Sequence, residues 1–409
     1  MSGFWRNVTS VLAGTALAQA VPVLASLIIA RQYAPAEFGM FAAWLGVVMF
    51  LGVVLTGRFE AALAIEEDGE PRRLAVISTL ATAALAAVLA GLVLVAVKAF
   101  VPSVAGKTPA LLIAIAIPAA LAIAAAQTWQ SWAAAEGRYR ALSVMRIAEA
   151  AMVALAQIAA GFVDASAAAL GGAHFLGVIF GLVVATFLMP VGALPEMGIV
   201  RTVRAFWRRH FRFPVWSLPA DAINAAAGQL PVLIVATRFG ADVAGLLAMT
   251  MKVLGAPIGL LGKAVLDVFK RRAASSFRER GECRSEYLQT FRVLAIGSLA
   301  FCAVMAMVSE DLFALAFGEN WRLAGTIAVW LLPLFALRFM ASPLSYMVYI
   351  AGKQHLDLIW QIALLGMTLA ALGLPRSHEP ALQAYSLGYS LLYLVYLAMS
   401  YRFSCGTSR

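Results

Sequence analysis

The chain has 409 residues, of which 62% are hydrophobic and 13% are charged. A soluble globular protein carries about 25% charged residues, so this composition excludes an ordinary soluble domain. It predicts an all-α polytopic membrane protein. At roughly 20 apolar residues per membrane-crossing helix, the chain has room for about a dozen spans and for little else.

Apolar segments of the required length recur along the whole chain. We predict spans at 8–30, 40–65, 74–99, 109–132, 142–163, 167–191, 216–237, 243–268, 287–308, 325–350, 355–374 and 381–402. The small residues from Ala16 to Ala20 resemble a signal-peptide cleavage site. Apolar sequence continues to Ala30, however, so we interpret the first segment as an uncleaved helix.

Lysine and arginine are distributed unevenly between the two sides that these spans define. Four lie inside spans, 21 fall on one side and six on the other. Because positively charged loops stay in the cytoplasm, both termini are predicted to be cytoplasmic. The formal net charge of +10 is also compatible with nucleic-acid binding. Because the basic residues are concentrated in the loops between spans, membrane topology explains the charge better, and we expect no nucleic-acid partner.

The longest polar interruption lies halfway along the chain and contains an amphipathic pattern. One stripe carries Arg201, Arg204, Arg208 and Arg212, and the other side carries mostly Ile199, Val203, Phe206 and Trp207. This pattern predicts a helix in the cytoplasmic membrane interface, held by anionic headgroups and buried apolar side chains. A plain, positively charged connector is the alternative. We therefore divide the chain into residues 1–194, a connector at 195–215 and residues 216–409.

The two halves share a weak repeat. Gln19 and Pro22 lie within the first predicted span, and Gln229 and Pro231 lie within the seventh. With six spans in each half, both would run in the same direction, which predicts parallel repeats related by an axis along the membrane normal. Proline removes a helical hydrogen bond and kinks the helix, so Pro22 and Pro231 are the candidate hinges.

Ionisable residues inside the spans are the candidate functional residues, because a charge at the bilayer centre costs about 2.5–3.5 kcal/mol on insertion scales. Arg58 and Glu60 lie near the end of the second predicted span. Residues that are two positions apart on an α-helix point about 200° away from each other, which predicts that Arg58 and Glu60 pair poorly. They are either structural residues bonded to neighbouring helices or a substrate-facing cation with an orienting carboxylate. The pair alone favours neither interpretation.

The second half holds most of the remaining charge. Lys252 and Lys263 are predicted to share a helix face, about 16 Å apart, and Lys263 can pair with Asp267 one turn later. Arg338 lies in the middle of the tenth span, and Asp221 lies in the seventh. Lys252 and Arg338 have no carboxylate near them in sequence. Surplus central cations favour an anionic ligand, because guanidinium and ammonium groups both bind phosphate.

The sequence contains no recognisable catalytic or metal-binding motif. Its three cysteines fit no zinc site, and its four histidines are scattered. No nucleophile motif or nucleotide-binding loop is present. We therefore expect no enzyme activity, no catalytic residue, no metal and no cofactor, with H+ or Na+ as the candidate coupling ion.

Three stretches of the sequence carry a family resemblance. They are Gly14–Phe41, Thr56–Ile65 with the acidic run Glu66–Glu70, and Phe317–Gly325. The chain resembles the Wzx-type polysaccharide (O-antigen, capsule, exopolysaccharide) flippases of the multidrug/oligosaccharidyl-lipid/polysaccharide exporter superfamily. The resemblance extends over essentially the whole length. It implies two six-helix lobes around a central cationic cavity, in the manner of MATE transporters, and residence in the bacterial inner membrane.

The resemblance also implies a function. Such a protein moves an undecaprenyl-pyrophosphate-linked oligosaccharide from the cytoplasmic to the periplasmic leaflet by alternating access, for surface polysaccharide synthesis. The residues expected to line the cationic cavity are Arg58, Lys252, Lys263 and Arg338, and those expected to orient them or exchange protons are Glu60 and Asp221. Implied partners are the lipid-linked glycan and membrane lipids. The polysaccharide polymerase and chain-length machinery are further candidates.

Two alternatives stay open. A cation-coupled multidrug antiporter of the same superfamily would use a carboxylate such as Asp221 to bind organic cations. A membrane glycan-transfer enzyme is less favoured, because such enzymes usually place catalytic residues in a sizeable loop. The predicted spans lack the two extra spans expected of peptidoglycan-precursor flippases, which speaks against that assignment.

Overall fold

The computed structural model describes residues 18–100, 108–192 and 198–406, including all their side chains except those of 97–100, 260, 263, 264 and 267. Every regular element in these ranges is a helix, which confirms the all-α membrane fold. Ten of the described helices are long and apolar enough to cross a membrane. The expected number of about twelve is therefore approximate.

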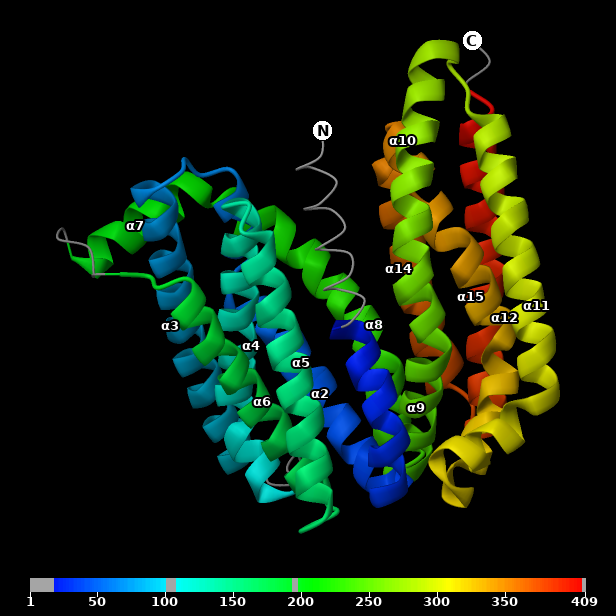
Figure 1. Cartoon of the computed structure of the whole chain (residues 1–409), viewed down its shortest axis with the longest axis horizontal. Coiled ribbons are helices and arrows are strands. Elements are labelled where there is room, and N and C mark those ends of the chain that lie inside the picture. Colours follow the sequence, from blue (N-terminus) through cyan, green and yellow to red (C-terminus); the bar gives the residue numbers. More distant parts are fainter. Residues whose placement is uncertain (1–17, 101–107, 193–197, 407–409) are drawn as a thin grey trace. The chain divides into compact units, whose positions relative to one another are not determined.

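The chain forms two compact units, Met1–Gln229 and Leu230–Arg409. The boundary falls inside helix α8, beyond the connector that we placed at 195–215, and two residues before Pro231. Unit 1 contains an apolar helix at Ala18–Gln32, then α2 (Pro35–Leu55), η1 (Phe59–Ala64), α3 (Glu70–Phe100), α4 (Ala110–Ala135), α5 (Tyr139–Gly161), α6 (Ala167–Leu188), α7 (Ile199–His210), η3 (Phe213–Ser217) and the first half of α8 (Leu218–Arg238) (Figure 1).

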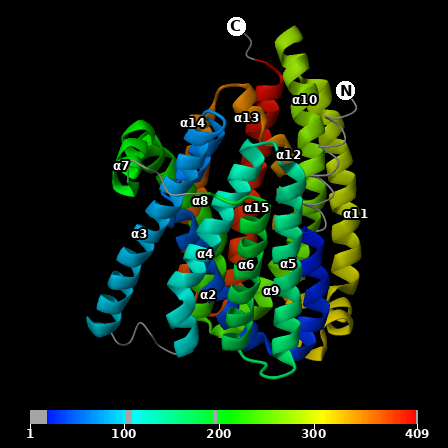
Figure 2. The same ribbon diagram turned by 60° about the vertical axis from the view of Figure 1, so that its left-hand side comes forward.

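Small residues and caps fix the helices of unit 1. Figure 2 shows α4, α5 and α6 side by side, in agreement with the contacts between them. Helix α6 approaches α5 so closely at Gly177 that a Cβ there would lie 2.4 Å from a side-chain carbon of Val153. Helix α6 begins at a serine cap, since the Ser166 hydroxyl accepts a hydrogen bond from the Ala169 amide at 3.2 Å. The Glu37 carboxylate accepts another from the Ala167 amide at 2.6 Å, which ties α2 to the same helix end.

Unit 2 contains the remaining helices. They are the second half of α8, α9 (Ala241–Pro257), η4 (Ile258–Gly262), α10 (Lys263–Arg280), α11 (Arg284–Phe317), η5 (Glu319–Trp321), α12 (Arg322–Leu344), α13 (Met347–Ile350), α14 (Gln354–Gly373) and α15 (His378–Ser404). Gly325 lets α12 approach the backbone of α11, where a Cβ would lie 2.5 Å from the Cα of Glu310. The Thr250 hydroxyl of α9 donates a hydrogen bond to the Ala324 carbonyl of α12 at 2.8 Å.

The first predicted span is only partly described, and the eighth is interrupted. Of the first, 8–30, residues 8–17 lie outside the described residues, and the described part is the helix Ala18–Gln32. The eighth, 243–268, is wrong as a single α-helix, because α9 ends at Pro257 and a π-helical turn, η4, separates it from α10. Proline has no N–H to donate within a helix, which favours a local change of hydrogen-bonding pattern at this point.

Candidate functional site

The chain turns sharply where we predicted a continuous helix. Helix α2 ends at Leu55, so the predicted span 40–65 is wrong beyond that residue. Gly57 and Arg58 have φ angles of 59° and 62°, in the left-handed region. Glycine adopts this conformation freely, but an arginine there is uncommon. The Thr56 hydroxyl supports the turn by accepting a hydrogen bond from the Arg58 amide at 3.3 Å, and the short helix η1 follows.

This turn brings together three of the predicted site residues, all in unit 1. The Arg58 Nη1 donates to the Glu60 Oε1 at 2.8 Å, and its Nε donates to the Asp221 Oδ2 of α8 at 2.5 Å. The expectation that Arg58 and Glu60 pair poorly is therefore wrong. It assumed α-helical geometry, whereas the left-handed backbone at Arg58 directs both side chains to the same side.

The cluster of Arg58, Glu60 and Asp221 is partly buried and carries an excess of negative charge. The Glu60 side chain is 6% exposed, and those of Arg58 and Asp221 are 33% and 34% exposed. Burial alone would lower the pKa of Arg58, but Glu60 and Asp221 raise it, so the guanidinium stays charged. Among the described residues the Glu60 Oε2 has no hydrogen-bond partner. This arrangement leaves one carboxylate oxygen of Glu60 able to accept a hydrogen bond or to contact a small cation.

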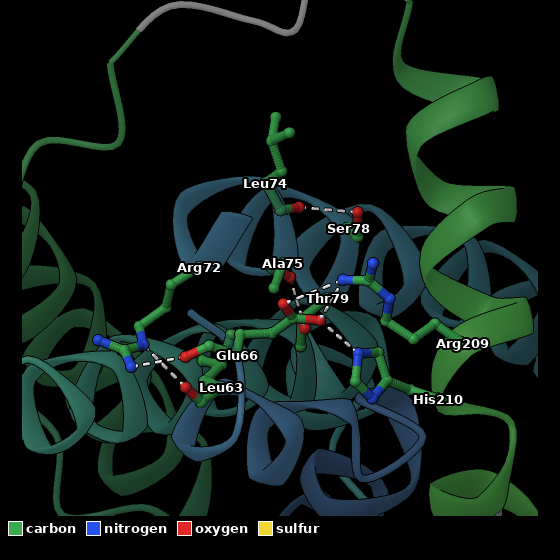
Figure 3. Close-up of polar contacts among 9 residues, drawn as sticks. All are labelled: Leu63, Glu66, Arg72, Leu74, Ala75, Ser78, Thr79, Arg209 and His210. Carbon is green, nitrogen blue, oxygen red and sulfur yellow. Dashed lines mark hydrogen bonds and ion pairs between the residues drawn. The ribbon is translucent and has the colours of Figure 1, made fainter. Parts of the chain in front are cut away.

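A second cluster, which the sequence analysis missed, lies directly after η1 (Figure 3). The buried Glu66 carboxylate pairs with His210 Nε2 of α7 and with the Arg209 Nη1 at 3.3 Å. Its backbone carbonyl accepts a hydrogen bond from the Arg72 Nη2 at 2.7 Å, and the Arg72 Nε donates to the Leu63 carbonyl at 2.9 Å. The end of η1, the start of α3 and the end of α7 are thus joined by polar contacts.

The apolar face of α7 packs on the protein. Phe206 is buried against Phe59 of η1, with ring centroids 5.2 Å apart, and against His210, at 4.8 Å. The Trp207 Nε1 donates a hydrogen bond to the Thr82 hydroxyl of α3 at 2.8 Å. The helix predicted in the connector is confirmed, but its apolar side chains Phe206 and Trp207 contact protein where we expected membrane.

The predicted cations of unit 2 are not paired with carboxylates. Lys252 of α9 is half-buried and has no polar partner among the described residues. Arg338 of α12 is exposed, lies 6.0 Å from the ring centroid of Phe335 and acts electrostatically on tyrosines of α15 such as Tyr389 and Tyr393. The hydrogen bond from Thr250 of α9 to Ala324 of α12 sets the register of the two helices. At 1.5 Å per residue, Lys252 and Arg338 then lie on the order of 15 Å apart along the helix axes.

Two further predictions concern α10 and the proline hinges. The side chains of Lys263 and Asp267 lie outside the described residues, so their pairing stays a prediction. The helical spacing assumed between Lys252 and Lys263 does not hold, because η4 lies between them. Pro22 lies within the helix Ala18–Gln32, and Pro231 is buried within α8.

Comparison with known proteins gives one family match and one curated relative. A family model described as polysaccharide biosynthesis protein matches residues 28–325. The teichuronic acid biosynthesis protein TuaB of Bacillus subtilis (strain 168) is 22% identical over 164 residues, which are 39% of this chain. The match spans 34% of TuaB, well under two thirds of that relative.

Solved structures share the fold. The lipid II flippase MurJ, in an inward closed conformation, matches with a TM-score of 0.75 at 11% identity, over 95% of this chain and 87% of MurJ. An inward-facing multidrug resistance MATE family transporter of the MOP superfamily matches with a TM-score of 0.62 at 11% identity, over 97% of this chain and 94% of the transporter. The family match confirms the resemblance to polysaccharide biosynthesis proteins, and these structures show that the chain shares the fold of a lipid II flippase and of a MATE family transporter.

Proposed function

Because the chain belongs to the polysaccharide biosynthesis protein family, we propose that it flips an undecaprenyl-pyrophosphate-linked oligosaccharide repeat unit across the bacterial inner membrane. Transport runs from the cytoplasmic to the periplasmic leaflet by alternating access, and both termini are cytoplasmic. The observation that carries the proposal is the pair of cations, Lys252 of α9 and Arg338 of α12, that lack a carboxylate partner among the described residues.

An anionic substrate would explain why the protein holds two cations without carboxylate partners. A cation at membrane depth costs about 2.5–3.5 kcal/mol on insertion scales, and a carboxylate partner would offset that cost. Where no such partner is present, an anionic ligand supplies the opposite charge. A pyrophosphate linkage offers several acceptor oxygens, Arg338 can bind them bidentately, and Lys252 adds a point charge. The separation of the two cations along the helices gives the anion successive binding positions.

The cluster in unit 1 has a different role in this proposal. Arg58 is already bound by Glu60 and Asp221, so an anion would have to displace a carboxylate to reach it. We assign Arg58 as a residue that contacts the substrate anion in only part of the transport cycle. Glu60 and Asp221 would orient Arg58 or exchange a proton. Pro22 and Pro231 would act as hinges, since proline weakens the helical hydrogen bonding around it.

The same cluster supports a second candidate function. Two carboxylates and one guanidinium leave one negative charge in excess, which suits a cationic ligand or coupling ion. A cation-coupled multidrug antiporter would use this charge to bind its substrate. The two functions differ in which unit contacts the substrate charge, unit 2 for the flippase and unit 1 for the antiporter.

Complementation of a deletion strain separates the two functions. Lys252→Ala and Arg338→Ala each remove a charged contact that contributes about 1.5–3 kcal/mol, so surface polysaccharide export should fall roughly tenfold to a hundredfold at normal protein abundance. Undecaprenyl-linked intermediates should accumulate inside. Arg376→Ala, at an exposed position between α14 and α15, is the matched control and should export normally.

Two results would contradict the flippase. Normal export by both Lys252→Ala and Arg338→Ala would show that these cations are structural. If the deletion leaves surface glycan and its lipid-linked precursors unchanged, but sensitises the cells to organic cations, the antiporter is the better assignment.

A further inference from the structure

Helix α7 presents a cationic surface that the proposed transport cycle does not use. Its outward face carries Arg201, Arg204 and Arg208, and Arg212 follows just beyond the helix end. All four side chains are exposed, and none has a carboxylate partner among the described residues. Arg209, by contrast, is paired with Glu66 at 3.3 Å. We call the four unpaired residues the arginine stripe.

Apolar side chains are exposed beside the arginine stripe. Val200 is 76% exposed and Phe211 is 53% exposed. At 100° per residue both lie on one edge of the stripe, between Arg204 and Trp207. Trp216, which follows on the π-helical turn η3, is 73% exposed. A purely aqueous cationic surface would leave these groups in water, whereas a bilayer interface accommodates both the charges and the apolar edge.

The packing of α7 on unit 1 fixes the direction of this surface. The Glu66–His210 pair and the Phe59–Phe206 contact hold the opposite face of the helix on η1, near the start of α3 (Figure 1). The arginine stripe therefore does not need to fold on binding. Because α7 lies between the transmembrane helices α6 and α8, it must also lie near one membrane surface, and its charge identifies the cytoplasmic one.

We propose that the arginine stripe of α7 is a binding surface for the anionic phospholipid headgroups of the cytoplasmic leaflet, with Val200, Phe211 and Trp216 inserted beside them. Phosphate esters are the shared chemistry of lipid headgroups and soluble phosphates. The exposed apolar edge favours the lipid, since a soluble phosphate gives these side chains nothing to contact. The proposal does not depend on which substrate the protein transports.

The test compares lipid binding by three variants of the full chain in neutral detergent. The first is Arg201→Gln/Arg204→Gln/Arg208→Gln, which removes charge, and the second is the corresponding triple lysine variant, which keeps it. The third, Arg271→Gln/Arg272→Gln/Arg278→Gln, removes the same charge from exposed positions of α10. Native mass spectrometry with phosphatidylglycerol and phosphatidylcholine in competition gives the apparent Kd of each lipid.

A basic residue near an anionic surface contributes about fivefold to binding. The triple glutamine variant of α7 should therefore weaken phosphatidylglycerol binding on the order of a hundredfold. The lysine variant should stay within a few-fold of wild type, and phosphatidylcholine binding should not change. Raising the salt concentration should reduce the difference, because screening weakens exposed charge interactions.

Three results would overturn the proposal. The first is unchanged phosphatidylglycerol binding by the glutamine variant of α7. The second is an equal loss in the α10 variant, which would show a response to net charge and not to this surface. The third is displacement of phosphatidylglycerol by inorganic pyrophosphate at equal concentration, which would identify a soluble phosphate site.

Discussion

Replacing His210 with phenylalanine isolates the electrostatic part of the contact that holds α7 on unit 1. The phenylalanine ring can keep the contacts that the histidine makes with Phe206 and Phe213, at centroid distances of 4.8 and 6.0 Å. It removes the Nε2 partner of the buried Glu66 carboxylate. The remaining partner of the carboxylate is Arg209, whose Nη1 lies 3.3 Å from the Glu66 Oε2 and whose side chain is exposed.

The expected magnitude follows from this geometry. Removing a hydrogen bond to a charged group costs about 1.5–3 kcal/mol. Arg209 retains part of the interaction, so we expect the lower end, about 1.5 kcal/mol. Every 1.4 kcal/mol is about tenfold in an equilibrium constant, so local detachment of α7 should become roughly tenfold more frequent.

Hydrogen–deuterium exchange of the α7 amides measures this detachment. His210→Phe should reduce the protection of the α7 amides roughly tenfold. Peptides from α14 in unit 2 should keep the protection that they have in the wild type. Arg204→Ala is the matched control, because it changes an exposed residue of the same helix with no ionic partner among the described residues. The double variant Glu66→Met/His210→Phe should recover most of the protection, since it leaves no buried charge.

Either of two outcomes would refute this reasoning. Unchanged exchange in His210→Phe would mean that Arg209 alone compensates Glu66. A double variant as labile as the single one would mean that α7 is held by the shape of the histidine and not by its charge contact.

Two further predictions concern packing and thiol chemistry. Gly177→Ala should lower the thermal denaturation temperature of the purified protein, because its Cβ would lie 2.4 Å from a carbon of Val153 and overpacking costs about 1–3 kcal/mol. Gly366→Ala, whose Cβ meets no atom within 4 Å, should not lower it. Burial, aided by a neighbouring carboxylate, raises the pKa of Cys283 to about 12. Its thiol therefore stays protonated at pH 8, and peptide mapping should find maleimide on the exposed Cys405 but on Cys283 only after denaturation.

The helices were predictable where the sequence pattern is local. Hydropathy alone predicts most of the spans, and the arginine stripe predicts α7. The end of α2 was not predictable from hydropathy, because residues 56–65 are nearly as apolar as the helix before them. The usable signal was Gly57, whose positive φ allows the chain to turn.

The contacts of the candidate site depend on long-range packing, which no local pattern encodes. Arg58 and Asp221 are separated by 163 residues, and Glu66 and His210 by 144. Which basic residue pairs with a buried carboxylate depends on how distant segments pack together, and a single sequence does not show that packing. One hint was present for the second pair, since the acidic run beginning at Glu66 is opposite in charge to the arginine-rich helix that it contacts.

The predicted charged residues are paired in unit 1 and unpaired in unit 2, and on this difference we base the proposal that the substrate charge binds in unit 2. In unit 1 the predicted charged residues already pair with one another, because the Arg58 guanidinium is bound by Glu60 and Asp221. In unit 2 Lys252 and Arg338 have none among the described side chains. In a buried ion pair, the partner charge offsets part of the desolvation cost. An unpaired cation carries the full desolvation cost until an anionic ligand binds. Under the proposed function an anionic substrate therefore gains more by contacting unit 2, and Arg58 becomes available to it only when Glu60 or Asp221 releases the guanidinium.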